Sequence, residues 1–313
     1  MRRFVKGLAA LSVAGVAGVV AVVLWPIGRQ PTAINLTGDV QRGAYLARAS
    51  GCIACHTNAE KGGAPLAGGA PLKTQFGTFF PPNLTPDPQY GIGDWTVTDF
   101  AQAVRQGVSP EGDPYYPTFT YPFYADFTDQ DIADLWAAFQ TVGPVAKAAP
   151  PHVVGFPFDQ RWGLKLWRAA FLTDPKTEPV AGQSDEWNRG RELVRGATHC
   201  GACHTTRNVV GARIADAVFS GNSDLPGSDR APSILSDTLR ERGWTVANLS
   251  YALQSGITPT GDVFGGSMGE VVQGGTKFLT KADRRAMATY IMDSDVAGDR
   301  VPRKAANTGT IFK

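Results

Sequence analysis

Cys52-Ile53-Ala54-Cys55-His56 recurs as Cys200-Gly201-Ala202-Cys203-His204, and these two stretches contain all four cysteines of the 313-residue chain. Two thiols three positions apart, followed at once by a histidine, form the attachment signature of c-type haem. Both thiols of a copy would bond to one porphyrin, and His56 or His204 would be the proximal ligand of its iron. We therefore predict two covalently bound haem c groups, which use all four thiols and leave none for a disulfide.

Two Cys-x-x-Cys pairs can also form a zinc site or a pair of thioredoxin-like redox centres. Neither alternative explains the histidine that follows directly in both copies. The strand-helix-strand context of a redox pair is also missing from the sequence pattern. The haem interpretation is therefore preferred.

Further matches, about 150 residues apart, indicate that the chain contains two related halves. Arg42-Gly43 precedes the first motif and Arg189-Gly190 precedes the second. Trp95-Thr96-Val97 and Trp244-Thr245-Val246 follow the two motifs at matching places. Each Trp-Thr-Val is expected to begin a short helix that a glycine ends.

This repeat, with 36 glycines and 22 prolines, predicts an all-α fold of two tandem cytochrome c-like domains with an N-terminal transmembrane helix. The predicted segments are an anchor at 1–28, cytochrome c domain 1 at 38–142, an interdomain linker at 143–184, cytochrome c domain 2 at 185–294 and a C-terminal tail at 295–313. We expect the aromatic-rich linker to pack across both domains. The tail is expected to be mobile or to dock a partner.

The N-terminal segment has the pattern of a membrane-crossing helix. Residues 8–24, LAALSVAGVAGVVAVVL, carry no charge and are just long enough to span a bilayer. Arg2, Arg3 and Lys6 precede them, and positive flanks stay in the cytoplasm. We therefore predict a single-pass inner-membrane protein with its globular part on the periplasmic side. The alternative is a cleaved signal peptide, which would also export the chain. With a net charge of +2 and no long basic run, nothing indicates a nucleic-acid partner.

From Trp95 and Trp244 onward the two halves align without a gap at an offset of 149 residues, which pairs Phe119 with Met268. Met268 lies in a glycine-rich stretch expected to be a flexible loop, from which a thioether can reach iron. We assign it as the distal ligand of the second haem. The alternative, a methionine that fills a gap in the core, suits Met287 and Met292 better, because both lie on the last predicted helix.

The first domain contains no methionine, and a phenyl ring cannot bind iron, so the distal ligand of the first haem is unknown. The candidates are Tyr115, Tyr116 and Tyr121 in the equivalent loop, His152 in the connecting segment, or an open position. The tyrosines can equally be packing residues, and His152 can be a surface loop residue. Arg161 and Arg207 are candidates for pairing with haem propionates, with solvated surface arginines as the alternative.

Beyond the two haem motifs, three stretches carry a family resemblance: Pro82–Pro88, Gly91–Trp95 and Tyr116–Tyr121. They resemble the cytochrome c subunits of membrane-bound alcohol, aldehyde and gluconate dehydrogenases, and more closely the diheme cytochromes of that superfamily. The chain departs from the dehydrogenase subunits in having two haem motifs where they usually have three. It also has Phe119 where their first domain typically has methionine.

The resemblance implies electron transfer from a periplasmic dehydrogenase to a cytochrome, an oxidase or a quinone-linked acceptor at the membrane. The chain would have no catalytic residue and would not be an enzyme by itself. Histidine-methionine ligation raises a haem potential, so electrons are expected to pass from the first haem to the second. The alternative function is a haem enzyme or sensor, with peroxide, a sulfur oxyanion or a gas bound at an open or labile first haem.

Overall fold

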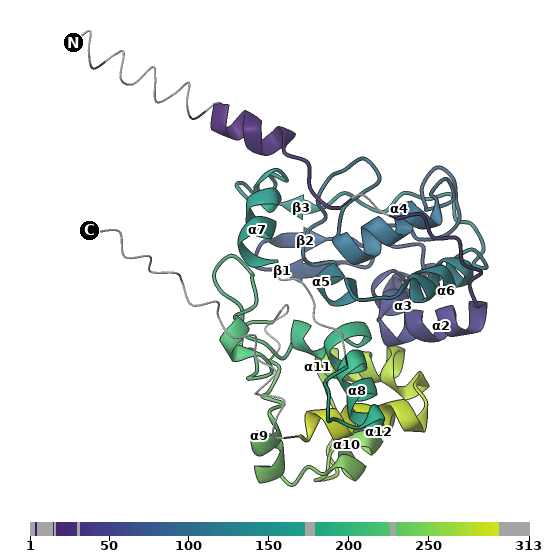
Figure 1. Ribbon diagram of the computed structural model, residues 1–313, viewed down its shortest axis with the longest axis vertical. Coiled ribbons are helices and arrows are strands. Elements are labelled where there is room, and N and C mark those ends of the chain that lie inside the picture. Colours follow the sequence, from purple (N-terminus) through teal and green to yellow (C-terminus); the bar gives the residue numbers. More distant parts are fainter. Residues whose placement is uncertain are drawn as a thin grey trace. The chain divides into compact units, whose positions relative to one another are not determined.

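The computed structural model describes residues 4, 15, 17–29, 32–172, 179–225 and 230–293 (Figure 1). Its described residues divide into two compact units. The first comprises residues 1–46 and 55–176, and the second comprises residues 47–54 and 177–313. The segment expected to link the domains is thus grouped with the first unit as far as residue 176. The predicted tail at 295–313 lies outside the described residues.

The elements follow one another along the chain as mostly short helices separated by long loops. Up to residue 172 they are α2 (Val40–Ala49), α3 (Cys52–Cys55), η1 (Ala59–Lys61), β1 (Leu72–Thr74), β2 (Gly77–Phe79), α4 (Val97–Ala101), η2 (Gln102–Gln106), α5 (Tyr121–Tyr124), α6 (Asp129–Phe139), β3 (Val153–Val154) and α7 (Gly163–Phe171). From residue 179 they are α8 (Asp185–Glu192), η3 (Leu193–Ala197), η4 (Cys200–Ala202), η5 (Ala215–Ala217), α9 (Ser236–Glu241), α10 (Val246–Ser255), α11 (Gly266–Gly274), η7 (Thr276–Phe278) and α12 (Lys281–Ile291).

Helices α4 and α10 begin where the repeated Trp-Thr-Val predicts. Thr96 and Thr245 each close a capping box with the residue three positions later, which satisfies backbone donors that a helix start leaves unpaired. The first helix continues through η2 and ends at Gly107, and α10 ends at Gly256. Both glycines have left-handed backbones, with φ of 61° and 78°. The predicted start and stop signals of this repeated helix are confirmed.

In the second unit, the repeated Arg-Gly pair lies where α8 crosses α12. Arg189 holds Asp283 of α12 with two bonds, Nε to Oδ1 at 2.9 Å and Nη2 to Oδ2 at 3.0 Å. A Cβ atom on Gly190 would lie 2.0 Å from the Ala286 carbonyl oxygen, so only glycine allows this approach of the two backbones. The bonds of the arginine hold α8 against α12, and the glycine allows the two helix backbones to come close together.

The first unit repeats this crossing with α2 and α6. Arg42 binds Asp134 of α6 through Nε at 2.8 Å and Nη2 at 3.1 Å. A Cβ atom on Gly43 would lie 1.8 Å from the Asp134 carbonyl oxygen. Burial alone would raise the pKa of the Asp134 carboxyl, but the bonds from Arg42, the Asp39 amide and Gln130 lower it overall. The pair therefore joins the first and last helices of the repeat in both units.

The prediction of an all-α fold is wrong, because the first unit contains a three-stranded antiparallel sheet. Strands β1 and β2 form a hairpin in which Leu72 pairs with Phe79, and β3 adds to β2 by pairing Val153 with Thr78. Strands of two or three residues are too short to show the alternation by which a strand is recognised in a sequence. The third strand comes from the connecting segment, so the sheet attaches that segment to the first unit.

The predicted N-terminal transmembrane helix is not supported either. Among the residues that the structure describes, no helix combines the length and the apolar character needed to cross a membrane. Of the predicted span at 8–24, the structure describes Gly15 and a helix at residues 17–24. The prediction rested on the uncharged, apolar sequence of this span and on the basic residues before it.

Candidate functional site

The two cysteine motifs each form a single helical turn. Cys52–Cys55 is helix α3, and Cys200 begins the 3-10 turn η4. A spacing of three residues on such a turn places both thiols on one face, as bonding to one flat ring requires. No disulfide joins any of the four cysteines in the described chain. Burial raises the pKa of the Cys200 thiol to about 11, although a bond from Thr198 opposes the shift.

The histidine of each motif is oriented by the carbonyl group of a distant proline. His56 Nδ1 lies 2.8 Å from the Pro82 oxygen, and His204 Nδ1 lies 2.7 Å from the Pro232 oxygen. A carbonyl oxygen only accepts hydrogen bonds, so Nδ1 carries the proton and Nε2 keeps a lone pair. A second group that fixes the tautomer and orientation of a metal-binding imidazole is the usual arrangement at a metal site.

The two histidines are also held in the neutral form that binds metal. Burial lowers the pKa of His56 to about 4, although its bond to the Pro82 carbonyl opposes the shift. Burial lowers the pKa of His204 in the same way. Thiols on one face followed by an oriented neutral imidazole are what a c-type haem needs, so the residues present fit this group.

A loop folds back onto each histidine in the same manner. The His56 carbonyl accepts from the Gly68 amide at 2.7 Å, and the His204 carbonyl accepts from the Gly221 amide at 3.0 Å. In each copy the residue two positions before this glycine has a left-handed backbone. These residues are Leu66 and Phe219, with φ of 59° and 63°.

The amides of these two residues bond to the threonine that follows each motif histidine. Leu66 N donates to Thr57 Oγ1 at 3.1 Å, and Phe219 N donates to Thr205 Oγ1 at 3.3 Å. These contacts were not predicted from the sequence. The repeated His-Thr pair was the signal that could have indicated them.

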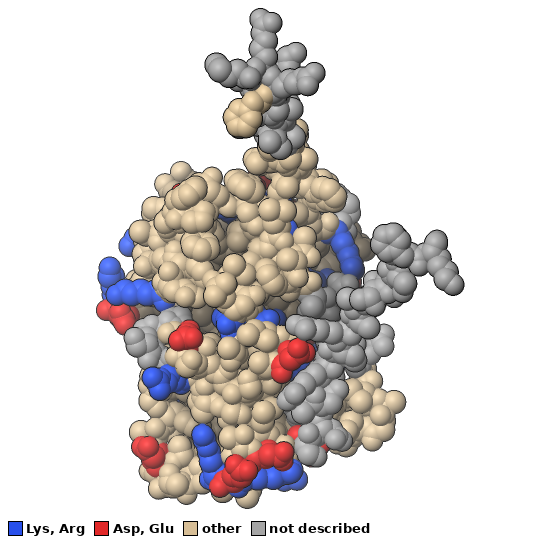
Figure 2. All heavy atoms as spheres, turned by 90° about the vertical axis from the view of Figure 1, so that its left-hand side faces the viewer, with Lys and Arg blue, Asp and Glu red and all other residues tan. Residues whose placement is uncertain are grey.

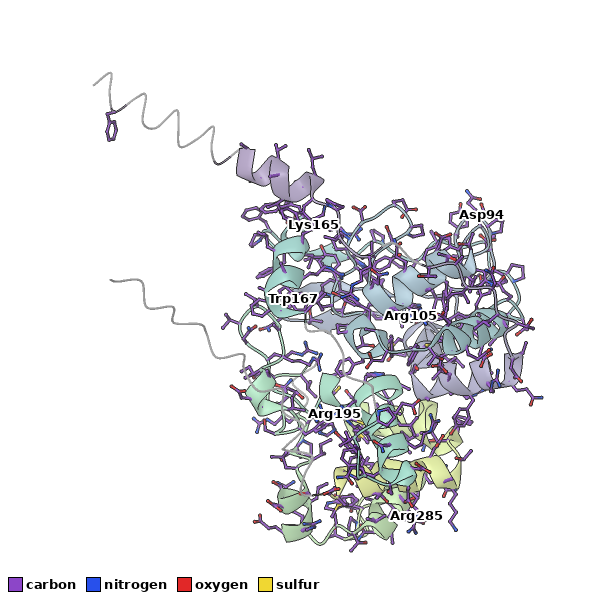
Figure 3. All side chains as sticks on the ribbon, viewed as in Figure 1. Asp94, Arg105, Lys165, Trp167, Arg195 and Arg285 are labelled. Atoms are coloured by element: carbon purple, nitrogen blue, oxygen red, sulfur yellow. The ribbon has the colours of Figure 1, made fainter. Side chains whose placement is uncertain are left out.

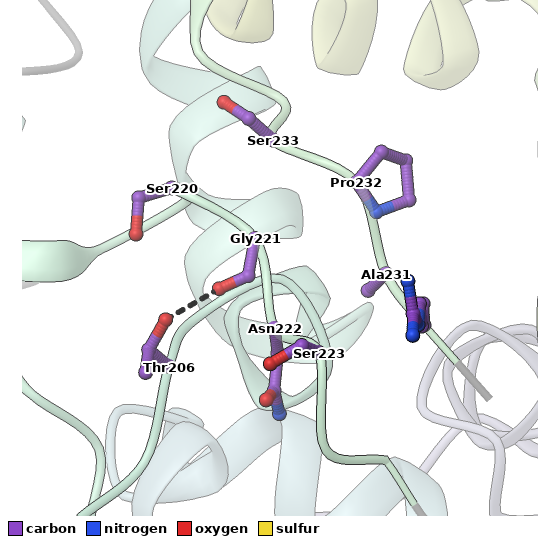
Figure 4. Close-up of a pocket in the computed structure, with 9 residues that line it drawn as sticks. Thr206, Ser220, Gly221, Asn222, Ser223, Ala231, Pro232 and Ser233 are labelled. Carbon is purple, nitrogen blue, oxygen red and sulfur yellow. Dashed lines mark hydrogen bonds between the residues drawn. The ribbon is translucent and has the colours of Figure 1, made fainter. Parts of the chain in front are cut away.

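A pocket of 560 Å³ lies beside the second motif, and Figure 4 shows the residues that line it. Thr206 and Pro232 belong to its wall, and Thr206 Oγ1 donates to the Gly221 carbonyl at 2.8 Å. Pro232 is the residue whose carbonyl orients His204. This wall therefore includes the backbone that positions the predicted proximal ligand.

Met268 lies in the first turn of helix α11, where the sequence predicted a flexible loop. The glycines around it are compatible with helix, and Gly265 is the N-cap residue with an extended backbone. Met268 is half-buried, whereas Met287 on α12 is 0% exposed and Met292 directly after α12 is also buried. The two methionines expected to be core residues are thus in the core, and Met268 is not.

Phe119, at the position that matches Met268, lies among aromatic rings in the first unit. Its ring centroid is 6.0 Å from that of Tyr121 and 6.1 Å from those of Tyr115 and Tyr124. Tyr121 is 1% exposed, and its ring packs on Gly107. At this position the first unit therefore has a phenyl ring packed against other rings, and the second unit has a methionine thioether.

The four candidate ligands of the first haem lie in the same unit. Burial raises the pKa of Tyr115, Tyr116 and Tyr121, which disfavours the tyrosinate that would bind iron. Tyr116 donates its hydroxyl to the Phe158 carbonyl at 3.0 Å. The ring of His152 lies 5.6 Å from that of Tyr116, and its Nδ1 accepts from the Phe80 amide at 3.1 Å. The structure thus brings Tyr116 and His152 together.

The two arginines considered for propionates both bond to carbonyl groups. Arg161 Nη2 donates to the Pro114 oxygen at 2.5 Å. Arg207 donates Nη2 to the Ala202 oxygen at 3.0 Å and Nη1 to the Gly211 oxygen at 2.7 Å. Ala202 lies inside the second cysteine motif, so Arg207 is attached directly to the predicted haem-binding turn.

An apolar surface lies on the connecting segment of the first unit. Val153, Phe156 and Leu166 are exposed, Phe156 to 82%. Strand β3 and helix α7 lie toward the left of the first unit in Figure 1, and Figure 2, which views the molecule from that side, shows mostly residues other than Lys, Arg, Asp and Glu over this unit. Lys165 of α7, labelled in Figure 3, donates to the carbonyls of Val23 and Trp25 and so joins the N-terminal segment to the same unit.

Short helices around a Cys-x-x-Cys-His turn, with the histidine oriented for metal binding, define the class of c-type cytochromes. No family model matches the chain. It is 40% identical over 298 residues to a diheme cytochrome c-type protein of Cereibacter sphaeroides, covering 93% of this chain and 97% of that protein.

Two further relatives are subunits of dehydrogenases. The gluconate 2-dehydrogenase cytochrome c subunit of Pantoea cypripedii is 38% identical over 284 residues, which cover 87% of this chain and 64% of the subunit. The fructose dehydrogenase cytochrome subunit of Gluconobacter japonicus is 36% identical over 276 residues, covering 87% and 54%. The matched region thus covers between about half and two thirds of the length of these two subunits. It belongs to this family of diheme cytochromes and dehydrogenase cytochrome c subunits, as the resemblance predicted, and its membership supports electron transfer with haem c.

Proposed function

We propose that the chain carries two covalently attached haem c groups and transfers electrons from a dehydrogenase to a respiratory acceptor. Cys52, Cys55 and His56 would hold the first haem, and Cys200 and Cys203 with His204 the second. The observation that carries this proposal is the same bond, from histidine Nδ1 to a proline carbonyl, at both motifs. A bound haem supplies one-electron chemistry without any bond made or broken in the protein.

The residues of this chain have three tasks in that function. The thiols fix the position of the ring, and each imidazole is presented by a proline carbonyl with Nε2 available to the iron. Met268 would be the distal ligand of the second haem. No side chain is assigned as catalytic, so the chain would work with a separate enzyme that oxidises the substrate.

The proposed partners rest on the printed names of the relatives. A dehydrogenase as electron donor is supported by the gluconate and fructose dehydrogenase subunits. Exposed apolar surface such as that on β3 and α7 is of the kind that protein partners cover. A cytochrome, an oxidase or a quinone-linked protein is proposed as the acceptor. We also propose that the chain works on the periplasmic side of the cytoplasmic membrane, supported by the charge and hydropathy pattern of residues 2–24.

The haem count tests the proposal directly. We expect two haems per chain that survive denaturation, because thioether bonds do not break when the fold is lost. The double change Cys52→Ala and Cys55→Ala should reduce the count to one, and so should Cys200→Ala with Cys203→Ala. The measurement is a haem stain and mass spectrum of the denatured chain. A haem that dissociates on denaturation, or a count that does not fall, contradicts the proposal.

A second candidate function follows from Phe119, which gives the first haem no thioether ligand. An open or labile first haem would suit an enzyme or sensor that binds peroxide, a sulfur oxyanion or a gas. Carbon monoxide distinguishes the two functions because it binds reduced iron only where a coordination position is open or easily vacated. We expect the reduced, unmodified chain to bind none, as an electron carrier with two six-coordinate irons would. Binding of one equivalent would favour the enzyme or sensor instead.

A further inference from the structure

The pocket beside the second motif (Figure 4) has a counterpart in the first unit. Asn222 in the pocket wall donates its backbone amide to the Ala231 carbonyl at 2.9 Å. In the first unit, the Gly69 amide donates to the Pro81 carbonyl at the same distance of 2.9 Å. Both bonds lie next to the glycine and the proline that contact the motif histidine, so Asn222 and Gly69 occupy matching positions. The group that covers Gly69 therefore indicates what the pocket beside Asn222 is suited to hold.

In the first unit this place is covered by the stretch of chain that follows helix α6. Asn83 donates Nδ2 to the Val145 carbonyl at 2.7 Å and to the Lys147 carbonyl at 3.1 Å. A Cβ atom on Gly69 would lie 3.5 Å from Cδ of Pro150, which is ordinary contact. An asparagine amide thus binds the backbone carbonyls of this stretch, and the proline of the stretch lies over the glycine.

The pocket of the second unit also contains an asparagine amide. Asn222 is 5% exposed, and no group in the described part of the chain accepts a hydrogen bond from its Nδ2. Its Oδ1 accepts from the Asp224 amide at 3.0 Å, which fixes the orientation of the side chain. A buried donor without an acceptor is unfavourable, so an acceptor bound in this pocket would be stabilised. A backbone carbonyl, such as those that Asn83 binds, is an acceptor of this kind.

The second unit has its own counterpart of the stretch, which follows helix α12. Val145-Ala146 and Pro150 follow α6, and Val296-Ala297 and Pro302 follow α12, at spacings that agree to within one residue. The two matches extend the internal repeat beyond the last helix of each unit. Residues 296–302 lie outside the described residues, and their sequence is that of the missing counterpart.

The chain leaves α12 on the side where the pocket wall continues into α9. Arg240 of α9 donates Nη2 to the carbonyl of Met292, directly after α12, at 2.5 Å. Helix α9 begins at Ser236, three residues after Ser233 of the pocket wall. An extended chain spans about 3.3–3.6 Å per residue, and the chain continues from Met292 to Lys313. Its length is therefore sufficient to pass along α9 to the pocket.

We propose that residues 296–302 bind in the pocket of their own unit, where a backbone carbonyl accepts from Asn222 Nδ2. They would lie there as residues 145–150 lie over the matching place of the first unit. The pocket wall includes Pro232, whose carbonyl orients His204. The bound segment would therefore hold this proline in place, which is a structural role separate from the proposed electron transfer.

Hydrogen exchange of the full chain, followed by mass spectrometry, tests this binding. We expect the amides of residues 297–301 to exchange at least tenfold more slowly than in a free peptide of residues 294–313, because ordered segments are protected. Residues 145–150 serve as the internal reference, since their bonds to the first unit are seen directly. Exchange as fast as in the free peptide would overturn the proposal.

Asn222→Asp tests whether the pocket is the binding place. The change keeps the oxygen that accepts from the Asp224 amide but removes the Nδ2 donor. We expect exchange of residues 297–301 to become at least tenfold faster, while exchange of α12 stays the same. Asn208→Asp is the matched control, because Asn208 of the same unit also accepts amides through Oδ1 but lies outside the pocket wall. It should leave the exchange of residues 297–301 unaltered.

The other outcomes also decide. Protection of residues 297–301 that persists in Asn222→Asp shows that they bind elsewhere and overturns the proposal. Protection that rises with protein concentration shows binding to a second copy and overturns it as well. If Asn222→Asp does not fold, a chain ending at Asp293 takes its place, and the backbone amides of Asn222 and Ala231 should then exchange at least tenfold faster than in the full chain. Unchanged exchange of these two amides would reject the bound segment.

Discussion

Reduced protein with Met268→Ala is expected to bind one more carbon monoxide per chain than the unmodified protein. Removing the thioether would leave the iron of the second haem with an open position. The reduction potential of that haem should fall by on the order of 0.1 V, within the roughly 0.8 V over which axial ligands tune haem proteins. Met268 is suited to this role because it is half-buried at the start of α11 and not packed into the core. Absorption spectra under carbon monoxide and a redox titration give both values.

Met287→Leu is the matched control for this prediction. Met287 is fully buried on α12, and leucine has a similar volume, so the change should be tolerated without any gas binding. If Met268→Ala leaves the spectrum and both potentials unaltered, Met268 is not a ligand. The same conclusion follows if Met287→Leu has the larger effect.

The variants Gly43→Ala and Gly190→Ala are expected to be strongly destabilising single-methyl changes. The added Cβ would lie 1.8 Å from the Asp134 oxygen in one case and 2.0 Å from the Ala286 oxygen in the other. Both oxygens belong to helix backbones, which cannot move aside as a flexible side chain can. We expect each change to lower the free energy of unfolding by about 1–3 kcal/mol or more, as overpacking does. Urea unfolding followed by circular dichroism measures this.

Gly163→Ala is the control for steric crowding. Gly163 begins helix α7, and a Cβ there would meet nothing within 4 Å. Alanine is a better helix former than glycine, so this variant should be unchanged or more stable by up to about 1 kcal/mol. Equal stability of all three variants would show that the two helix crossings are looser than they are in the structure.

The local features of the fold were predicted well from the sequence. The starts of α4 and α10 at Trp-Thr-Val and the glycines that end these helices depend on residues within a turn of one another. Such signals are short in range and appear directly in the order of residues. The repeated Arg-Gly pair was also recognised in the sequence, although its contacts were not predicted. Only the structure shows that the arginine reaches an acid on the last helix of each unit.

One error concerns a contact between distant residues, and the other two concern local helices. Strand β3 lies more than 70 residues after β2, and both are too short for a recognisable pattern. The N-terminal membrane helix was predicted from hydropathy and from the basic residues before it, and no described helix is long and apolar enough to cross a membrane. Met268 was placed in a loop because glycine favours loops, but α11 begins at Gly266 with Gly265 as its N-cap.

The sequence by itself determined the chemistry of the chain: two thiol pairs, each followed by a histidine, fit one cofactor, and the repeat places one such site in each half. The tertiary structure decided how the histidines of those sites are oriented and which groups surround them. It brought Pro82 to His56 and Pro232 to His204, and it attached Arg207 to the Ala202 carbonyl inside the second motif. The physical reason is the separation along the chain over which each feature depends on other residues. Covalent attachment depends on neighbours in the chain, whereas orientation and electric field depend on groups that only folding brings together.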